Sequence, residues 1–521
     1  MSFKLTYATM FSPPEELHGA YESALAQVRA ELGRSHALYI DGRDVPGAAS
    51  IDAFNPARQP QLLGRFGKAN LEQMRAAVGA ARMARAAWAE MPPARRIELS
   101  RKVAALIEAR VYTIAAALTL EVGKNRMEAL GEAQEAADFF WSYAADFEKN
   151  AAYVHALPDD PLADWKSHNR STLKPYGVWA VISPFNFPLA LAAGPVAAAL
   201  VTGNCVVLKT PPETPWAGRW LADCIRDAGY PPGVFNFLCG DGEVGAQLVA
   251  HPDVAGLTFT GSYAVGMSVH RQLQAGAWAK PCIAEMGGKN ACIVTAHADL
   301  DRACAGIVRS AYGMGGQKCS ALSRLYVEEP VADALAAKLV QRANALRIAD
   351  PTLRGTELGP VISARAAARY EDYAALLRTR GSRLLCGGTR PREGELAQGH
   401  YVAPILSEAP PDHPLFTQEM FLPILMMARV KNLDEAIGRA NDTPLGLTAG
   451  CYGNPAEVEE FERRIEAGVL YVNRPQGATT GAWPGYQAFA GWKGSSSTGK
   501  AIGSFYYLPQ YLREQSLTWV E

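Results

Sequence analysis

Cys319 lies in the segment of this sequence that is best suited to nucleophilic chemistry. The segment is Gly-Gly-Gln-Lys-Cys-Ser-Ala, residues 315–321, and it places a thiol in a glycine-rich turn beside Lys318. Backbone amides and a nearby cation favour the thiolate, which is the reactive form of cysteine. From spacing alone two interpretations stay open, a catalytic nucleophile and an ordinary core thiol, because most buried cysteines are small core residues.

A carboxylate and an amide occupy two further segments suited to catalysis. Glu285 opens Glu-Met-Gly-Gly-Lys-Asn, residues 285–290, directly after a predicted strand, where a carboxylate can reach water or substrate as a general base. Asn186 lies in Pro-Phe-Asn-Phe-Pro, residues 184–188, an apolar loop in which its amide can donate to an oxyanion. The alternatives are a surface turn for Glu285 and a loop-capping role for Asn186.

Residues 259–262, Phe-Thr-Gly-Ser, end a predicted strand and open a predicted helix that contains Gly266. This arrangement lets backbone amides approach a pyrophosphate. The Gly-x-x-x-x-Gly spacing differs from the usual dinucleotide fingerprint, so this segment alone is a weak indication.

The elements that must position these residues change character along the chain. The first third is predicted to be mostly helical, and from residue 177 short β-rich runs alternate with helices, which is typical of βαβ units and a parallel sheet. Ligands of such sheets bind at the carboxyl ends of the strands. Strands are expected at 178–182, 205–208, 234–238 and 257–259, and helices at 215–228, 243–250 and 263–273. A second α/β block is expected over 283–473, with strands at 291–294, 324–327 and 424–429.

Composition excludes several classes of protein. The 521 residues include 51 Lys and Arg against 52 Asp and Glu, and this balance argues against a nucleic-acid or anionic-membrane partner. The longest apolar run, residues 187–201, is shorter than the roughly 20 residues of a membrane span. No secretory signal is visible, so a cytoplasmic protein of two or three folded units is expected. The nine cysteines include no Cys-x-x-Cys pair, which argues against disulfides and zinc, and no metal is predicted.

Taken together, these segments resemble the aldehyde dehydrogenase superfamily from about residue 38 to the C-terminus. The matching segments are 184–188, 207–209, 259–262, 285–289, 316–320, 418–423 and 441–446. The resemblance implies an α/β fold with a Rossmann-type cofactor domain, an α/β catalytic domain and a small β oligomerisation flap. The implied division is 1–158 for the helical part of the cofactor domain, 159–174 for an oligomerisation hairpin, 175–283 for the Rossmann-type core, 284–480 for the catalytic domain, and 481–521 for an anchor loop and C-terminal strand.

The resemblance also implies a role for each matching residue. Cys319 is then the nucleophile, Asn186 and the Cys319 backbone N–H hold the oxyanion, and Glu285 activates the hydrolytic water. The implied cofactor is NAD, held by Ser183, Lys209, Gly261, Ser262, Glu419 and Phe421.

One departure from the family affects the cofactor. Many NAD-preferring relatives have Glu three residues after the lysine, whereas this chain has Pro212, with Glu213 one place later. A carboxylate at that position repels a 2′-phosphate, so its absence leaves NADP possible.

Within the superfamily the chain is most similar to the pyrroline-5-carboxylate dehydrogenases, whose substrate is L-glutamate γ-semialdehyde. The shared segments are 37–40, 135–139 and above all Gln-Lys-Cys-Ser-Ala at 317–321. The resemblance places the substrate carboxylate on Ser320 and on the backbone of Gly477 and Ala478, the ammonium on Glu135, and the aliphatic stem between Phe187 and Phe489. For Glu135 the alternative is an exposed helical carboxylate.

The anchor region departs from this group, because about four extra residues, 485–488, precede Phe489 and Ala490 replaces a usual glycine. A changed loop keeps other substrates open: another semialdehyde, or an aromatic aldehyde stacked on Phe187, Trp483 or Tyr486. A coenzyme-A-acylating enzyme and a catalytically silent relative are further alternatives, against which Glu285 and the intact catalytic set argue. A homo-oligomer is implied, formed through residues 159–174 and 505–521.

Overall fold

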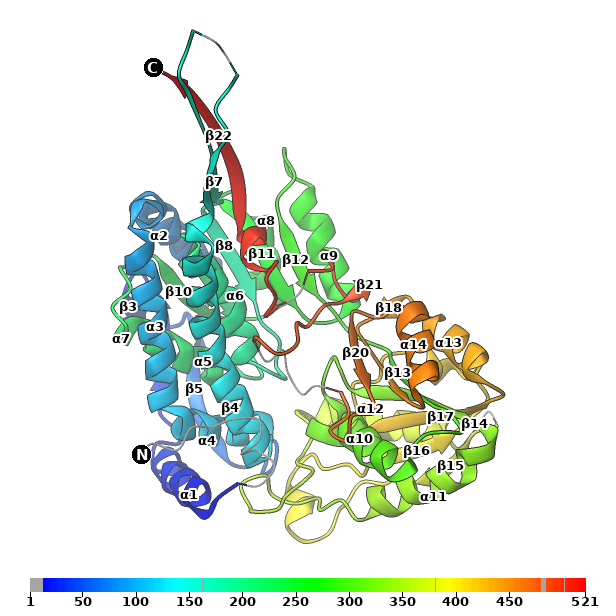
Figure 1. Cartoon of the computed structure of the whole chain (residues 1–521). Helices are drawn as coiled ribbons and strands as arrows, with labels where there is room; N and C mark the ends of the chain where they lie inside the picture. Colours follow the sequence, from blue (N-terminus) through cyan, green and yellow to red (C-terminus); the bar gives the residue numbers. More distant parts are fainter. Residues whose placement is uncertain (1–12, 162–163, 380, 479–483, 501) are drawn as a thin grey trace.

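Two seven-stranded sheets and a projecting flap form the framework of the chain (Figure 1). The computed structural model describes residues 13–161, 164–379, 381–478, 484–500 and 502–521. The α/β class expected from the sequence is confirmed.

The first sheet has the order β12-β11-β8-β9-β10-β2-β3. Strands β8 to β12 are parallel, while β2 and β3 run antiparallel at one edge. The strands are β2 (Leu38–Ile40), β3 (Arg43–Val45), β8 (Val178–Ile182), β9 (Cys205–Thr210), β10 (Phe235–Cys239), β11 (Val254–Thr260) and β12 (Cys282–Glu285). From β8 the chain continues to β9 and β10 on one side, and returns to β11 and β12 on the other. This reversal makes the carboxyl ends of β8 and β11 the expected ligand crevice of the sheet.

Helices cover both faces of this sheet. The helices between its strands are α6 (Ala190–Val201), α7 (Pro215–Asp227), α8 (Gly242–Ala250) and α9 (Tyr263–Gln274). The preceding helices are α1 (Glu15–Ala30), α2 (Leu71–Glu90), α3 (Pro93–Ala109), α4 (Val111–Val122) and α5 (Arg126–Lys149). Among the described residues no single helix is long and apolar enough to cross a bilayer, although α3 and α4, bent by 70°, pass together on length and composition.

Helix α2 shows why the sequence pattern was informative. Asn70 caps it through a capping box with Gln73, and Met74, Val78, Ala81 and Trp88 are buried along one face, as their helical spacing predicts. Leu71, which has the same helical spacing, is only half-buried. The mostly helical expectation for the first third missed a small sheet of β1 (Ser35–His36), β4 (Ala49–Phe54) and β5 (Leu62–Lys68).

The second sheet has the order β15-β16-β17-β14-β13-β19-β20, and all its pairs are parallel except β15 with β16. Its strands are β13 (Asn290–Val294), β14 (Leu322–Glu328), β15 (Arg383–Cys386), β16 (Ile405–Glu408), β17 (Ile424–Val430), β19 (Thr448–Tyr452) and β20 (Val469–Val472). Its helices are α10 (Leu300–Tyr312), α11 (Glu329–Asn344), α12 (Ala364–Leu376), α13 (Leu433–Asn441) and α14 (Pro455–Arg464). Two apolar clusters pack around this sheet, one against each face.

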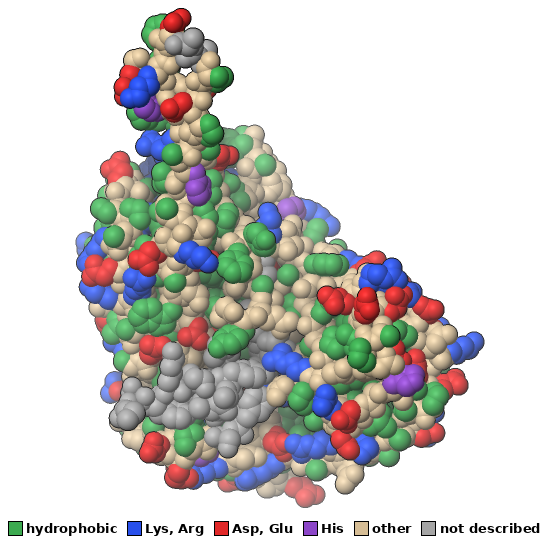
Figure 2. All heavy atoms as spheres, in the orientation of Figure 1, with side chains coloured by type: hydrophobic (Ala, Val, Ile, Leu, Met, Phe, Trp, Pro, Cys, Tyr) green, Lys and Arg blue, Asp and Glu red, His purple; other side chains and the backbone are tan. Residues whose placement is uncertain are grey.

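A three-stranded flap extends away from both sheets (Figures 1 and 2). It consists of β6 (Val154–Leu157), β7 (Ser167–Pro175) and β22 (Leu512–Val520), paired antiparallel in the order β22-β7-β6. The C-terminal strand therefore pairs with the hairpin of β6 and β7, and it begins at Leu512. Exposed apolar side chains on the flap are Val154, Leu157, Trp165, Leu517, Trp519 and Val520.

Candidate active site

The loop that precedes β14 presents Cys319 between the two halves of the molecule. It begins with the short 3-10 turn Gly313–Gly316, in which Met314, Gly315 and Gly316 all have positive φ. A Cβ on Gly316 would lie 2.2 Å from the carbonyl oxygen of Leu422, so only glycine fits there. Eight of the nine cysteines are buried, whereas Cys319 is partly exposed. The structure thus separates Cys319 from the other thiols.

The surroundings of Cys319 act on its pKa in two directions. Burial of the thiol raises its pKa to about 12, with smaller contributions from the negative charges of Glu419 and Glu285. The backbone N–H groups of Ser320 and Cys319 lower it, as expected for a glycine-rich turn. Lys318 is not among the leading influences, so its cation favours the thiolate less than its place beside Cys319 led us to expect. The Lys318 amine lies beside Gly313 near the Glu128 carboxylate, whose charge acts on it.

Glu285 ends β12 in an apolar setting. Its side chain is buried, one carboxyl oxygen accepts from the Ser496 hydroxyl at 3.4 Å, and the other has no hydrogen-bond partner among the described residues. Burial raises the pKa of Glu285 well above its usual range. A raised pKa suits a carboxyl to general-base catalysis, because the ionised carboxylate then binds a proton from water more strongly.

Asn186 is tied directly to the nucleophile loop. Its Nδ2 donates to the carbonyl oxygen of Gln317 at 2.9 Å, and the side chain is buried. Gln317 is itself held, because its Oε1 accepts from the Ile362 N–H at 2.9 Å and its Nε2 donates to the Met314 carbonyl at 3.0 Å. A primary amide has two N–H donors, so Asn186 keeps one for an oxyanion.

The carboxyl ends of β8, β9 and β11 bring together four of the residues expected to hold a cofactor. The Ser183 N–H donates to the Lys209 carbonyl at 3.2 Å, and the Ser183 hydroxyl is buried without a hydrogen-bond partner among the described residues. Ser262 caps the exposed N-terminus of α9 by accepting from the Val265 N–H, and Gly261 precedes it. An unpartnered hydroxyl, a buried lysine and a helix N-terminus at the crevice of the sheet fit a dinucleotide.

Glu419 and Phe421 approach the same region from the second half of the chain. Glu419 accepts from the Gly288 N–H at 3.0 Å, and a Cβ on Gly287 would lie 2.3 Å from its carboxylate. Phe421 has a positive φ of 57° and packs edge-on against Phe185 at 5.8 Å between ring centroids. The glycine pair therefore allows a close approach of Glu419 to the segment that follows the candidate base.

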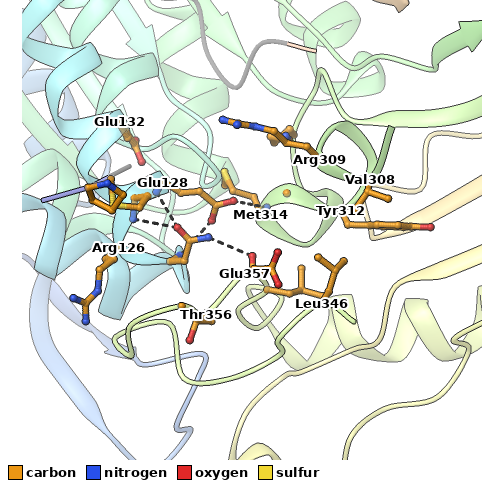
Figure 3. Close-up of a pocket in the computed structure, with 18 of the residues that line it drawn as sticks. Arg126, Glu128, Glu132, Val308, Arg309, Tyr312, Met314, Leu346, Thr356 and Glu357 are labelled. Atoms are coloured by element: carbon orange, nitrogen blue, oxygen red, sulfur yellow. Dashed lines mark hydrogen bonds between the residues drawn. The ribbon is translucent and has the colours of Figure 1, made fainter. Parts of the chain in front are cut away.

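A cavity of about 690 Å³ adjoins the nucleophile loop (Figure 3). It is lined by α5, by α10 and by residues 355–358, and both Glu135 and Phe187 contribute to its wall. Glu135 is 3% exposed, so its alternative as an exposed helical carboxylate was wrong. The Lys318 amine is buried here and has no hydrogen-bond partner among the described residues, and burial lowers its pKa to about 8.

The ring of Phe187 contacts a buried ion pair. The Lys124 amine lies 3.5 Å from the centre of the Phe187 ring and 2.5 Å from the Glu132 carboxylate. Glu132 also accepts from the N–H groups of Leu189 and Ala190, at the start of α6. The loop of Asn186 and Phe187 is thereby anchored to α5.

The other expected substrate residues lie outside the wall of this cavity. Ser320, Gly477, Ala478 and Phe489 are all buried. The Gly477 N–H donates to the Arg474 carbonyl at 2.9 Å, and the Ala478 N–H to the Ser310 hydroxyl at 2.7 Å. Both amides are therefore engaged within the protein. Phe489 pairs with Ile502 in an isolated bridge. Tyr486 is 85% exposed, and Trp483 lies outside the described residues.

Asn290 is a site residue that the sequence motif did not single out. Its side chain contacts both the nucleophile loop and the start of β19, as described below. The segment Gly-Gly-Lys-Asn offered a signal, because an asparagine two residues after a glycine pair needs hydrogen-bond partners if it is buried. Among the described residues, no group of three or more side chains is placed to hold a metal ion.

Comparisons with known proteins assign the class of protein that this fold and site define. The aldehyde dehydrogenase family model matches residues 45–517, and the chain belongs to that family. It is 37% identical over 498 residues to the 1-pyrroline-5-carboxylate dehydrogenase of Geobacillus thermodenitrificans, with 94% of each chain covered. A similar enzyme of Halalkalibacterium halodurans is 37% identical over 495 residues, covering 94% of this chain and 93% of the relative.

Solved structures point to the same group. A mutant of Thermus thermophilus 1-pyrroline-5-carboxylate dehydrogenase superposes with a TM-score of 0.92 at 36% identity, covering 99% of both chains. The enzyme from Thermus with bound NAD gives a TM-score of 0.91 at 35% identity, again over 99% of both chains. The resemblance found in the sequence motifs is confirmed.

Proposed function

We propose that this chain oxidises L-glutamate γ-semialdehyde, the open form of pyrroline-5-carboxylate, to L-glutamate in proline catabolism. The observation that supports this most is the similarity, over 94% of both chains, to an enzyme named for that activity. The site supports it too, because Asn186 is bonded to the nucleophile loop and the charge of Glu285 acts on the Cys319 thiol. Lys318 of the same loop and Phe187 line the adjoining cavity.

Cys319 is the proposed nucleophile. Its sulfur adds to the aldehyde carbon to give a thiohemiacetal, and the free N–H of Asn186 and the Cys319 backbone N–H hold the oxygen. A donor of this kind is worth about 3 kcal/mol in the transition state. Because the thiol has a raised pKa in the free protein, it must lose its proton as the substrate and cofactor bind.

A bound nicotinamide would accept the hydride that leaves the thiohemiacetal carbon. Loss of this hydride converts the thiohemiacetal to a thioester on Cys319. Ser183, Lys209, Gly261 and Ser262 are proposed to hold the dinucleotide, and Glu419 with Phe421 its nicotinamide ribose. Glu285 then takes a proton from water, which attacks the thioester and releases the carboxylate product and the Cys319 thiol. Burial raises the pKa of Glu285 well above its usual range, and the carboxyl works as a base only when it is ionised.

The proposed substrate is an amino acid with an aldehyde at the end of its side chain. Glu135 is proposed to face the ammonium, Phe187 and Phe489 the aliphatic stem, and Ser320 with the Gly477 and Ala478 backbone the carboxylate. Since the last two amides donate within the protein, carboxylate binding there requires them to exchange partners. The Lys318 amine in the cavity wall is an additional cation suited to the carboxylate.

NAD is the proposed cofactor, with NADP as the alternative. Pro212 and the exposed side chain of Glu213 follow Lys209, and no carboxylate stands at the usual position. The proposed assembly is a homo-oligomer formed through the flap of β6, β7 and β22, whose exposed apolar side chains suit an interface.

Rates of NADH and NADPH formation with pyrroline-5-carboxylate, with and without coenzyme A, test this proposal. We expect faster reduction of NAD, free glutamate as the product, and no effect of coenzyme A. A glutamyl thioester of coenzyme A as the product would show the acylating alternative. Turnover of benzaldehyde without turnover of pyrroline-5-carboxylate would show that the substrate is an aromatic aldehyde.

A further inference from the structure

Asn290 holds the nucleophile loop through its side chain. It begins β13, is 3% exposed, and its Nδ2 donates to the carbonyl oxygens of Cys319 at 2.7 Å and Ala321 at 2.8 Å. Its Oδ1 accepts from the Thr448 N–H at 2.9 Å. Two carbonyls on one side and an N–H on the other fix the orientation of the amide and satisfy both its donors.

The bond to Cys319 has a consequence for the sulfur. A trans peptide is planar, and its C=O and N–H point in opposite directions. When Asn290 holds the carbonyl of Cys319, the N–H of Ser320 in the same peptide must therefore point away from Asn290. The Ser320 N–H forms a hydrogen bond to the Cys319 thiol, and this bond lowers the pKa of the thiol.

Glycine allows the two segments to meet. A Cβ on Gly288 would lie 2.5 Å from the Cys319 carbonyl oxygen and 2.6 Å from the Asn290 side-chain oxygen. The loop carbonyl therefore packs against the backbone of residue 288. The Thr448 hydroxyl donates to the carbonyl of Ser320 at 3.4 Å, and this hydrogen bond is longer than the two that Asn290 donates to the loop.

We infer that Asn290 is a positioning residue, which fixes the peptide between Cys319 and Ser320 so that its N–H points at the sulfur and stabilises the thiolate. This inference rests on the proposed role of Cys319 as the nucleophile. The charged groups that act on the sulfur are Glu285 from β12, Glu419 from the loop before β17 and, more weakly, Lys318. The hydrogen bonds of Asn290 go to other groups, so these charges stay in place when Asn290 is replaced.

The chain offers a matched control in Asn236, on β10 of the other sheet. Asn236 is also fully buried and donates to two carbonyls, those of Val206 and Gly233, and accepts from the Asp41 N–H. Replacing it removes the same kind of bonds far from the sulfur. A purely structural role of Asn290 predicts the same behaviour for both asparagines.

The test is the rate of iodoacetamide alkylation of Cys319 between about pH 6 and pH 10, read by mass spectrometry of its peptide. We expect Asn290→Ala to react about tenfold more slowly at pH 8, with a profile displaced to higher pH, and kcat to fall about tenfold. Asn236→Ala should lose thermal stability but keep the wild-type profile. If Asn290→Ala does not fold, Asn290→Ser, whose hydroxyl donates one bond, should show about a threefold decrease.

An unchanged alkylation profile in the Asn290 variant, or an equal displacement in Asn236→Ala, would overturn the inference. Alkylation needs neither aldehyde nor cofactor, so its result can be interpreted even if the proposed substrate is wrong. A Cys319 peptide that stays unmodified in the wild type at every pH, while activity persists, would instead contradict the proposed nucleophile.

Discussion

Asn186 and Gln317 are joined by a hydrogen bond of 2.9 Å from the Asn186 amide to the Gln317 carbonyl oxygen. The two residues come from different halves of the chain, the loop after β8 and the loop before β14. The bond therefore couples the proposed oxyanion donor to the proposed nucleophile, two residues further along the chain. It leaves one N–H of Asn186 available for the reacting oxygen.

Replacing Asn186 should remove both this tether and the oxyanion bond. We expect Asn186→Ala to lower kcat by about 100-fold or more, since loss of one oxyanion donor costs about 3 kcal/mol. Cofactor affinity, measured by fluorescence titration, should change less than about twofold, because Asn186 is not among the residues proposed to hold the dinucleotide. A kcat within a factor of about three of the wild type would contradict the oxyanion role.

Glu285 should make stability depend on pH. Its folded-state pKa is raised by burial, so the folded chain binds the proton more tightly than the unfolded chain does. The stability due to this group is present below the unfolded value of about 4.5 and is lost as pH rises toward the folded pKa. Glu285→Gln does not ionise, so its melting temperature relative to the wild type should increase between about pH 5 and pH 8. A pH-independent difference would contradict the raised pKa of Glu285.

Gly287 should control the position of Glu419. A Cβ at Gly287 would lie 2.3 Å from the Glu419 carboxylate, the flexible end of a side chain, which can move aside. Gly287→Ala should therefore raise KM for NAD about tenfold with little loss of stability. Gly79→Ala, in a helix position with no atom within 4 Å of the added Cβ, is the control and should stabilise α2 by about 0.5–1 kcal/mol. An unchanged KM in Gly287→Ala would argue against the cofactor role of Glu419.

Replacing Lys318 should change KM only for aldehydes that carry a carboxylate. Its amine is buried in the cavity, and burial lowers its pKa to about 8, so it is charged below that pH and neutral above it. We expect Lys318→Met to raise KM for glutamate semialdehyde about tenfold at about pH 7 and to leave KM for butanal unchanged. Wild-type KM for the semialdehyde should rise above about pH 8, while that of Lys318→Met should not. Equal effects on both aldehydes would contradict a carboxylate site at Lys318.

The sequence predicted the parts of the structure that depend on local pattern. Strand β8 was expected at 178–182 and is found at Val178–Ile182, because short β-rich runs between helices mark parallel strands. The expectation that backbone N–H groups act on the Cys319 thiol is met, but the groups are those of Ser320 and Cys319 and not those of the glycines.

Features that depend on the direction of the backbone over several residues could not be predicted from the sequence. The left-handed conformation of Met314, Gly315 and Gly316 and the interaction of Lys318 with Glu128 do not follow from neighbouring residues in the sequence. The partners of the Gly477 and Ala478 amides are likewise tertiary. A second Gly-Ala pair, at 481–482, begins four residues after the first, and this separation equals the length of the insertion of about four residues. The second pair lies outside the described residues. The small sheet of β1, β4 and β5 was missed because β1 has only two residues and β4 is mostly exposed, so neither strand shows a clear apolar pattern.

The central claim is tested most directly by turnover of pyrroline-5-carboxylate in the wild type and in Cys319→Ala, with NAD reduction and glutamate measured together. The proposed function predicts one glutamate formed for each NAD reduced in the wild type, and no turnover in Cys319→Ala. Absence of glutamate in the wild type, or full activity of Cys319→Ala, would contradict it.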